Sequence, residues 1–295
     1  MKKIFVLLCV LVMFAGIAIA EDIGVTVGAD FTLNNLNKAN GDEWNPVIMP
    51  YIIYDTSFGD LDFSTELDYY FDFEPNFDEL SQYLDFDLKL TYNLSLGSAS
   101  TLLLEADNIL ENFSVSPDFG DYIEGTFTPR VRFTQKTDMG SFFAQVAAPI
   151  GYLENDYKWL RSRLGWTSTF GLRLWAQLDS SLIDPTEIYQ GWRIFAAYGA
   201  DSFSFDVTTR GYKDTSTGLR IEPNFEYYLG DATLRVGARF EGVAGDDGYK
   251  YIRVTPGVDY TLGALAFKVE CEFMDITGKS GEMSISPTLG VSFSF

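Results

Sequence analysis

Acidic residues occupy several alternate positions in two neighbouring segments, residues 61–73 and 83–94. Asp85 and Asp87 are one such pair, and two carboxylates can act as general acid and base on a glycosidic bond. In an extended strand, however, positions i and i+2 project from the same face, and nothing nearby gives the two groups different pKa values. The acid clusters Asp246–Asp247 and Asp60–Asp62 could hold calcium, but they lack the spacing of a calcium loop. We therefore predict a solvated wall of acids and no metal site. The predicted wall consists of Asp62, Glu66, Asp68, Asp72, Asp85, Asp87, Glu105 and Asp107.

Arginine takes over the alternate positions between residues 122 and 212. Because an arginine facing the midplane of a bilayer costs roughly 2–4 kcal/mol, these side chains are expected to point into an aqueous interior. We expect the acids and arginines to face each other across part of a pore and to set up a transverse field. The alternative is that the charges pair with neighbouring strands and only stiffen the wall. The arginines are Arg130, Arg132, Arg161, Arg163, Arg173, Arg193 and Arg210.

The chain contains no histidine. Ser-His and Asp-His catalysis are therefore impossible, which disfavours hydrolase barrels. Zinc sites also lose their commonest ligand. We expect no enzyme activity, no cofactor and no metal.

The elements that must position these charges are extended strands. Beyond residue 21, apolar and polar residues alternate in segments of about ten residues separated by Gly, Asn, Asp or Ser, which is typical of a membrane β-barrel. No second apolar run of about 18 residues follows, which excludes a helical membrane protein. The expected ascending strands are 22–34, 61–73, 101–110, 141–152, 170–178, 202–212, 232–243 and 264–274. The expected descending strands are 46–55, 83–94, 122–134, 158–167, 189–199, 219–229, 249–260 and 283–295.

This pattern predicts an all-β fold: a closed antiparallel transmembrane β-barrel of 16 strands. The weakest segment is 158–178, where Thr167, Ser168 and Thr169 would form the turn. If that turn were absent, and one further strand were lost, the count would be 14. An even count places both termini in the periplasm, with tight turns on that side and longer acidic connections outside. Those connections are expected at 35–45, 74–82, 111–121, 179–188 and 275–282.

Each descending segment ends in an aromatic residue before a short turn. Regular spacing of such residues predicts a girdle at the periplasmic membrane interface, although aromatic residues also favour strands anywhere. The residues are Tyr54, Tyr92, Phe133, Trp166, Tyr198, Tyr227, Tyr260 and Phe295.

Five descending segments also contain a proline, which cannot donate to a strand ladder. We expect a bulge at a common height in each of them. The prolines are Pro50, Pro129, Pro223, Pro256 and Pro287.

The final segment alternates Leu289, Val291, Phe293 and Phe295 with small or polar residues. It resembles the terminal signature of bacterial outer-membrane β-barrels. The resemblance implies that these four residues form the signal recognised by the barrel-assembly machinery. It is specific only in this segment, and no single porin family is matched.

Residues 1–20 are predicted to be an export signal, with Lys2 and Lys3 before an apolar run and small residues before Glu21. A transmembrane anchor is the alternative, but the apolar run is short. Residues 21–295 would then form one barrel domain. Removing two of 21 basic residues leaves 19 against 42 acidic ones, a net charge of −23, so nucleic acid is not expected as a partner. Only Cys271 would remain, so no intramolecular disulfide is expected.

Together these features predict a porin-like channel in the outer membrane of a Gram-negative-type bacterium, for passive and weakly selective diffusion of small hydrophilic solutes and ions. The expected partners are outer-membrane lipid, the assembly machinery and those solutes. Small residues such as Ala144 and Ala148 would permit a homo-oligomer. A surface receptor or adhesin that displays short acidic loops is the main alternative, and a soluble β-sandwich is another. A fatty-acid transporter is disfavoured, because it would need an N-terminal plug and an apolar lumen.

Overall fold

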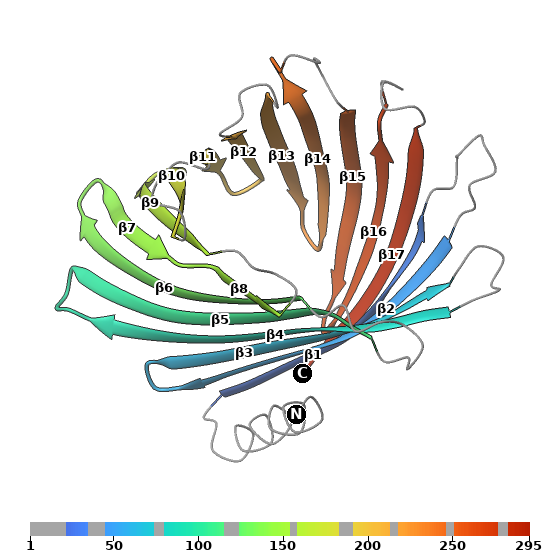
Figure 1. Ribbon diagram of the computed structural model, residues 1–295, viewed down its shortest axis with the longest axis horizontal. Coiled ribbons are helices and arrows are strands. Elements are labelled where there is room, and N and C mark those ends of the chain that lie inside the picture. Colours follow the sequence, from blue (N-terminus) through green and yellow to red (C-terminus); the bar gives the residue numbers. More distant parts are fainter. Residues whose placement is uncertain are drawn as a thin grey trace.

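The computed structural model describes residues 22–34, 45–73, 80–114, 124–153, 158–182, 191–212, 218–245, 251–276 and 283–295. The predicted export signal and most of each predicted acidic connection lie outside these residues. The described part forms a single antiparallel sheet that curves round until its first strand meets its last (Figure 1). None of the described residues forms a helix long and apolar enough to span a membrane.

The strands follow one another round the sheet in chain order. The first six are β1 (Asp22–Asn34), β2 (Asn45–Phe58), β3 (Leu61–Phe73), β4 (Leu80–Ser95), β5 (Ser100–Ser114) and β6 (Glu124–Thr137). The next six are β7 (Gly140–Ala147), β8 (Ile150–Leu153), β9 (Trp159–Ser168), β10 (Leu172–Ser181), β11 (Gly191–Gly199) and β12 (Phe203–Tyr212). The last five are β13 (Leu219–Leu229), β14 (Ala232–Val243), β15 (Tyr251–Leu262), β16 (Leu265–Met274) and β17 (Ser284–Ser294).

Segments β7 and β8 are two parts of one strand, because both pair with β6 and they are separated only by Ala148 and Pro149. Proline lacks the N–H that a ladder needs, so the regular pairing stops there. The ladder is bridged locally, since the Ala148 N–H donates to the Pro129 carbonyl at 3.0 Å. Counted this way, the described residues form a closed 16-stranded barrel, which confirms the predicted count and excludes 14.

The barrel closes between β1 and β17, which pair in register from Thr26 opposite Ser294 to Thr32 opposite Thr288. Two further backbone bonds extend the seam: the Val25 N–H donates to Phe295 and the Phe295 N–H to Val25, at 3.1 and 2.9 Å. Closure matters physically because a strand edge left open in hydrocarbon would carry unsatisfied N–H and C=O groups.

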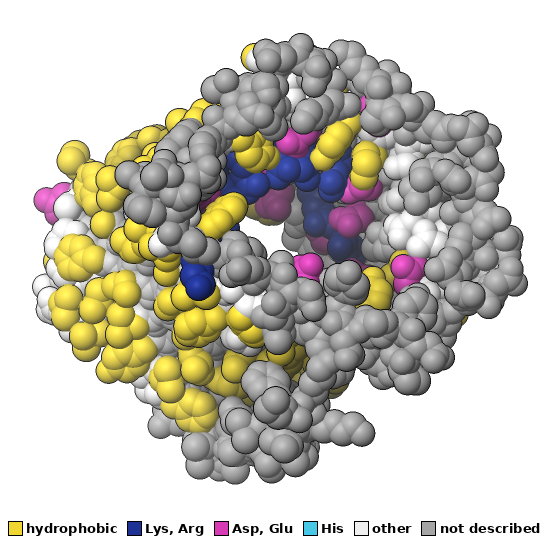
Figure 2. All heavy atoms as spheres, in the orientation of Figure 1, with side chains coloured by type: hydrophobic (Ala, Val, Ile, Leu, Met, Phe, Trp, Pro, Cys, Tyr) yellow, Lys and Arg dark blue, Asp and Glu magenta, His cyan; other side chains and the backbone are white. Residues whose placement is uncertain are grey.

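The two faces of the sheet differ as alternation requires. On β17, Leu289, Val291 and Phe293 are 55%, 44% and 38% exposed on the outer face. The opposite face is inner, because side chains there reach over an intervening strand: Arg235 of β14 contacts Glu270 of β16 at 2.8 Å. Figure 2 shows the same division, with apolar side chains over the outside and charged ones gathered round a central opening.

The strand assignments made from the sequence are confirmed within a few residues, including the weakest one. Strand β9 ends at Ser168 and β10 begins at Leu172, so a turn does interrupt residues 158–178. Ser168 helps to form it, because its hydroxyl accepts the Leu172 N–H at 2.8 Å. The bulges predicted at the prolines are wrong. The register is continuous across all five, and the shifts lie elsewhere, at Leu84–Phe86 and Leu219–Ile221.

Most of the predicted interface aromatics project from the outer face. Tyr92, Phe133, Tyr198, Tyr227 and Tyr260 are between 39% and 42% exposed, and Phe295 is 68% exposed. Their place at a membrane interface stays a prediction.

Two of the set behave differently. Trp166 packs between the rings of Phe142 and Phe170, whose centres lie 6.1 and 6.2 Å from its own. Tyr54 is only 2% exposed, and its ring packs edge-on against Phe63, with ring centres 6.0 Å apart.

The turn between β9 and β10 contains Gly171, whose backbone conformation can be tested by substitution. It has φ +95°, and a Cβ placed there would overlap the carbonyl oxygen of Gly199. We predict that Gly171→Ala lowers the free energy of unfolding by about 2 kcal/mol, measured by urea unfolding in detergent. Gly199→Ala is the matched control, because a Cβ there meets nothing within 4 Å. Equal stability of the two variants would contradict the strained-turn assignment.

Candidate functional site

The inner face of β3 and β4 carries like charges directly opposite each other. Asp68 of β3 pairs with Asp85 of β4, and Glu66 pairs with Asp87. Facing carboxylates repel, so pairing of this kind does not stabilise a sheet. Among the described residues, no group of three or more His, Cys, Asp or Glu side chains is arranged to hold a metal ion.

Two of the remaining predicted acids accept hydrogen bonds. Asp62 accepts hydrogen bonds from Ser57 at 3.0 Å and Asn93 at 3.2 Å. Asp72 accepts one from Asn45 at 2.7 Å. Asp107 lies opposite Lys89 in the ladder between β4 and β5.

Glu105 marks the boundary between the acids and the arginines. It is 8% exposed and lies between two cations, with Lys89 of β4 at 3.7 Å and Arg130 of β6 in direct contact. A carboxylate this well enclosed is stabilised by its two charged partners. The predicted alternative, in which charges stiffen the wall, therefore describes Glu105 and Arg130 well.

Four arginines and two glutamines of β6 to β12 form a continuous row of paired residues on the inner face. The ladder pairs Arg132 with Gln145, Gln145 with Arg163, and Arg163 with Gln177. It continues from Gln177 to Arg193 and from Arg193 to Arg210. We call these six residues the arginine row.

Glutamine separates the arginines over the first part of the row. The Arg163 Nε donates to the Gln177 side-chain oxygen at 3.0 Å, and the Gln177 amide donates to Asp179 at 2.7 Å. Asp179 is 5% exposed and lies 3.8 Å from Arg161. Arg161 therefore lies one rung from the arginine row, beside an acid. Arg173 lies two rungs from the row, towards the tight turn between β9 and β10.

Aromatic residues on the inner face were missed by the sequence analysis. Phe143, Trp175 and Phe195 form the rung next to the arginine row, with Gly165 between Phe143 and Trp175. A Cβ at Gly165 would overlap the Phe143 ring, so the glycine makes room for it. We call the three rings the aromatic rung.

The aromatic rung supports the arginine row through cation–π contacts. The guanidinium of Arg132 lies 3.9 Å from the Phe143 ring centre, and that of Arg163 lies 4.1 Å from the Trp175 ring centre. Such contacts hold an arginine without neutralising it. The sequence does contain a signal for Trp175: it lies two residues from both Arg173 and Gln177, so alternation places it on the same face of the strand as they are.

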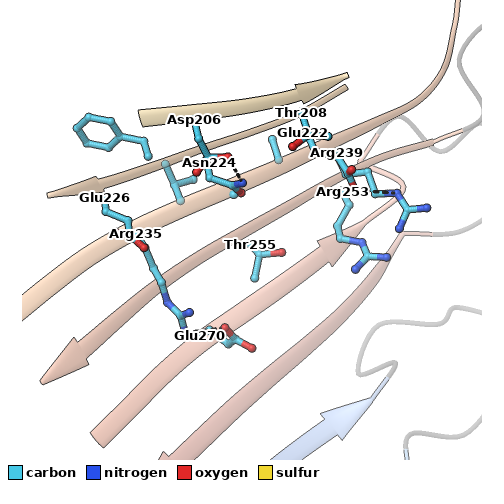
Figure 3. Close-up of a pocket in the computed structure, with 14 residues that line it drawn as sticks. Asp206, Thr208, Glu222, Asn224, Glu226, Arg235, Arg239, Arg253, Thr255 and Glu270 are labelled. Carbon is cyan, nitrogen blue, oxygen red and sulfur yellow. Dashed lines mark hydrogen bonds and ion pairs between the residues drawn. The ribbon is translucent and has the colours of Figure 1, made fainter. Parts of the chain in front are cut away.

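The inner face of β12 to β16 has mixed charge and encloses a hollow of about 540 Å³. Each arginine of β13 to β15 has an acid, as where Arg239 contacts Glu241 at 3.0 Å and Arg253 contacts Glu272 at 2.9 Å. Figure 3 shows the labelled side chains around the hollow, with Thr255 between the side chains of Arg235 and Arg253. Paired charges make this sector close to neutral, unlike the acidic strands β3 to β5 and the arginine row.

The ring order places the sectors relative to one another. With β7 and β8 taken as one strand, β12 lies eight steps from β3 in a ring of 16, which is half way round. Arg210 on β12 therefore lies across the barrel from the acids of β3, whereas Arg130 on β6 lies next to Glu105. The opposition of the two charge types across the passage stays a prediction.

No protein-family model and no curated protein matches this chain. Solved structures of the porin of Rhodopseudomonas blastica do match it. One engineered variant of that porin is 14% identical, with a TM-score of 0.50 over 93% of this chain and 100% of that chain. A triple mutant of it is 13% identical, with the same coverage and TM-score. This similarity establishes the fold: the chain is a 16-stranded β-barrel of the porin type.

Neighbouring residues on β15 provide a test of the two faces. Thr255 belongs to the inner hollow, whereas Val254 pairs with Ala238 on the outer face. In a Cys271→Ser background, we predict that Thr255→Cys in lipid vesicles reacts with a charged, water-soluble thiol reagent and that Val254→Cys does not, because charged reagents do not enter hydrocarbon. The rate of modification is the readout. A faster reaction at position 254 would reverse the assignment of inside and outside.

Proposed function

We propose that this protein is an outer-membrane channel for passive, weakly selective diffusion of small hydrophilic solutes and ions. The observation that carries the proposal is the charged inner face round a central opening in a closed wall whose outer face is apolar (Figure 2). A wall of this kind keeps every backbone polar group paired while it separates water from hydrocarbon. A 16-stranded ring is also wide enough to leave an aqueous passage.

The distribution of charge supports weak selectivity instead of strong preference for one sign. Acids dominate β3 to β5, arginines dominate β6 to β12, and the remaining inner face is largely paired. An ion therefore meets both signs at different points round the same opening. The local field orients dipolar solutes, and neither cations nor anions are excluded from the whole cross-section.

The outer-membrane location, the periplasmic termini and delivery by the barrel-assembly machinery belong to the same proposal. The exposed apolar band, the even strand number and the alternation ending at Phe295 support them. The alternative of a receptor or adhesin depends on the acidic connections, which lie outside the described residues.

Conductance across a planar bilayer tests the function and the role of the arginines together. We predict that replacing Arg161, Arg163 and Arg173 by glutamine lowers the anion-to-cation permeability ratio by roughly threefold at low salt, because three positive charges leave the passage. The ratio follows from the reversal potential in a KCl gradient.

The matched control is a triple exchange of similar size on the acid side, Glu66→Gln with Asp68→Asn and Asp87→Asn. Its reversal potential should move in the opposite direction. Two shifts of the same sign, or no shift in either variant, would contradict the assignment of these residues to the conducting path.

A further inference from the structure

Arg193 and Arg210 lie directly opposite each other on β11 and β12. Neither makes an ion pair with any described residue, and the Nε atom of each is buried without a hydrogen-bond acceptor. Two like charges in this relation destabilise the pairing of their strands. The pair differs from Arg163, which has Gln177 as an acceptor, and from Arg220, whose Nε contacts Glu241 at 2.7 Å.

The next rung of the same strands combines an aromatic ring with a small residue. Phe195 lies opposite Thr208. On its other side, Phe195 stacks on Trp175, with ring centres 5.1 Å apart and an interplanar angle of 10°. Thr208 is small and forms part of the wall of the hollow. The Arg173 guanidinium lies 6.0 Å from the Phe195 ring centre.

Two successive rungs on one face of a strand are roughly 7 Å apart. The site therefore offers two guanidinium groups and, one rung away, an aromatic ring opposite a small residue that lines the hollow. Guanidinium groups bind carboxylates through paired N–H donors. Rings pack favourably against other rings, edge-on or offset. A solute with a carboxylate fixed directly to an aromatic ring presents both features at a matching separation.

We propose that Arg193, Arg210 and Phe195 form a binding site for aromatic carboxylates on the inner face of the barrel. The carboxylate accepts hydrogen bonds from the two guanidinium groups, including the unsatisfied Nε donors. The ring lies beside Phe195 and over Thr208. This inference deepens the proposed function, on which it rests, by naming a class of solute that the passage retains more strongly than others.

Calorimetric titration of the full-length protein in detergent tests the site without any need for conduction. We expect benzoate to bind at least about threefold more tightly than acetate, because only benzoate gains the ring contact. Benzyl alcohol, which has the ring but no charge, should give no measurable binding. Equal affinity for benzoate and acetate would overturn the proposal.

Variants separate the two parts of the site. Phe195→Leu should reduce the affinity for benzoate to that for acetate and leave acetate unchanged, whereas Arg193→Gln with Arg210→Gln should abolish binding of both anions. Phe205→Leu is the matched control, because Phe205 is 44% exposed on the outer face of the neighbouring strand. Loss of benzoate preference in the Phe205 variant, or its retention in the Phe195 variant, would count against the site.

The outcome for the channel is independent of this result. Bilayers that conduct KCl while benzoate binds no better than acetate would remove the inference and leave the proposed function. Benzoate binding by a protein that does not conduct would do the reverse.

Discussion

The pairing of β1 with β17 is the contact on which the rest of the structure depends. Without it the sheet would have two edges, and each edge would expose a row of backbone donors and acceptors. With it, every strand has two neighbours and the sheet has an inside and an outside. Alternation along each strand then places successive side chains on opposite sides of the wall, so residues one position apart experience different solvents.

The inner face shows three ways of keeping charge on a strand. In the mixed sector, arginine and glutamate neutralise each other, as at Arg239 and Glu241. At Glu105, one buried carboxylate forms ion pairs with two cations, Lys89 and Arg130. In the arginine row, the Gln177 oxygen and two aromatic faces hold Arg163 and Arg132 instead, so their charge is retained. The third arrangement leaves a field in the passage, whereas the first largely cancels it.

Much of this architecture could be predicted because period-two alternation is a local property. The strand boundaries, the strand number and the phase of Arg163 or Asp68 all follow from counting residues. The stacking of Trp175 on Phe195 could not be predicted, because apolar residues had been assigned to lipid and the two rings meet only through the register of β10 with β11. The glutamines of the arginine row were missed for a similar reason: Gln145 and Gln177 acquire their role from the strands on either side.

The central claim is that a closed wall separates water inside from hydrocarbon outside. The most direct test is the current through a planar bilayer after addition of the purified, refolded full-length protein, recorded at several KCl concentrations. The account predicts discrete current steps whose size rises with the salt concentration, as for a water-filled passage. A folded, membrane-inserted protein that gives no steps at any concentration would contradict it.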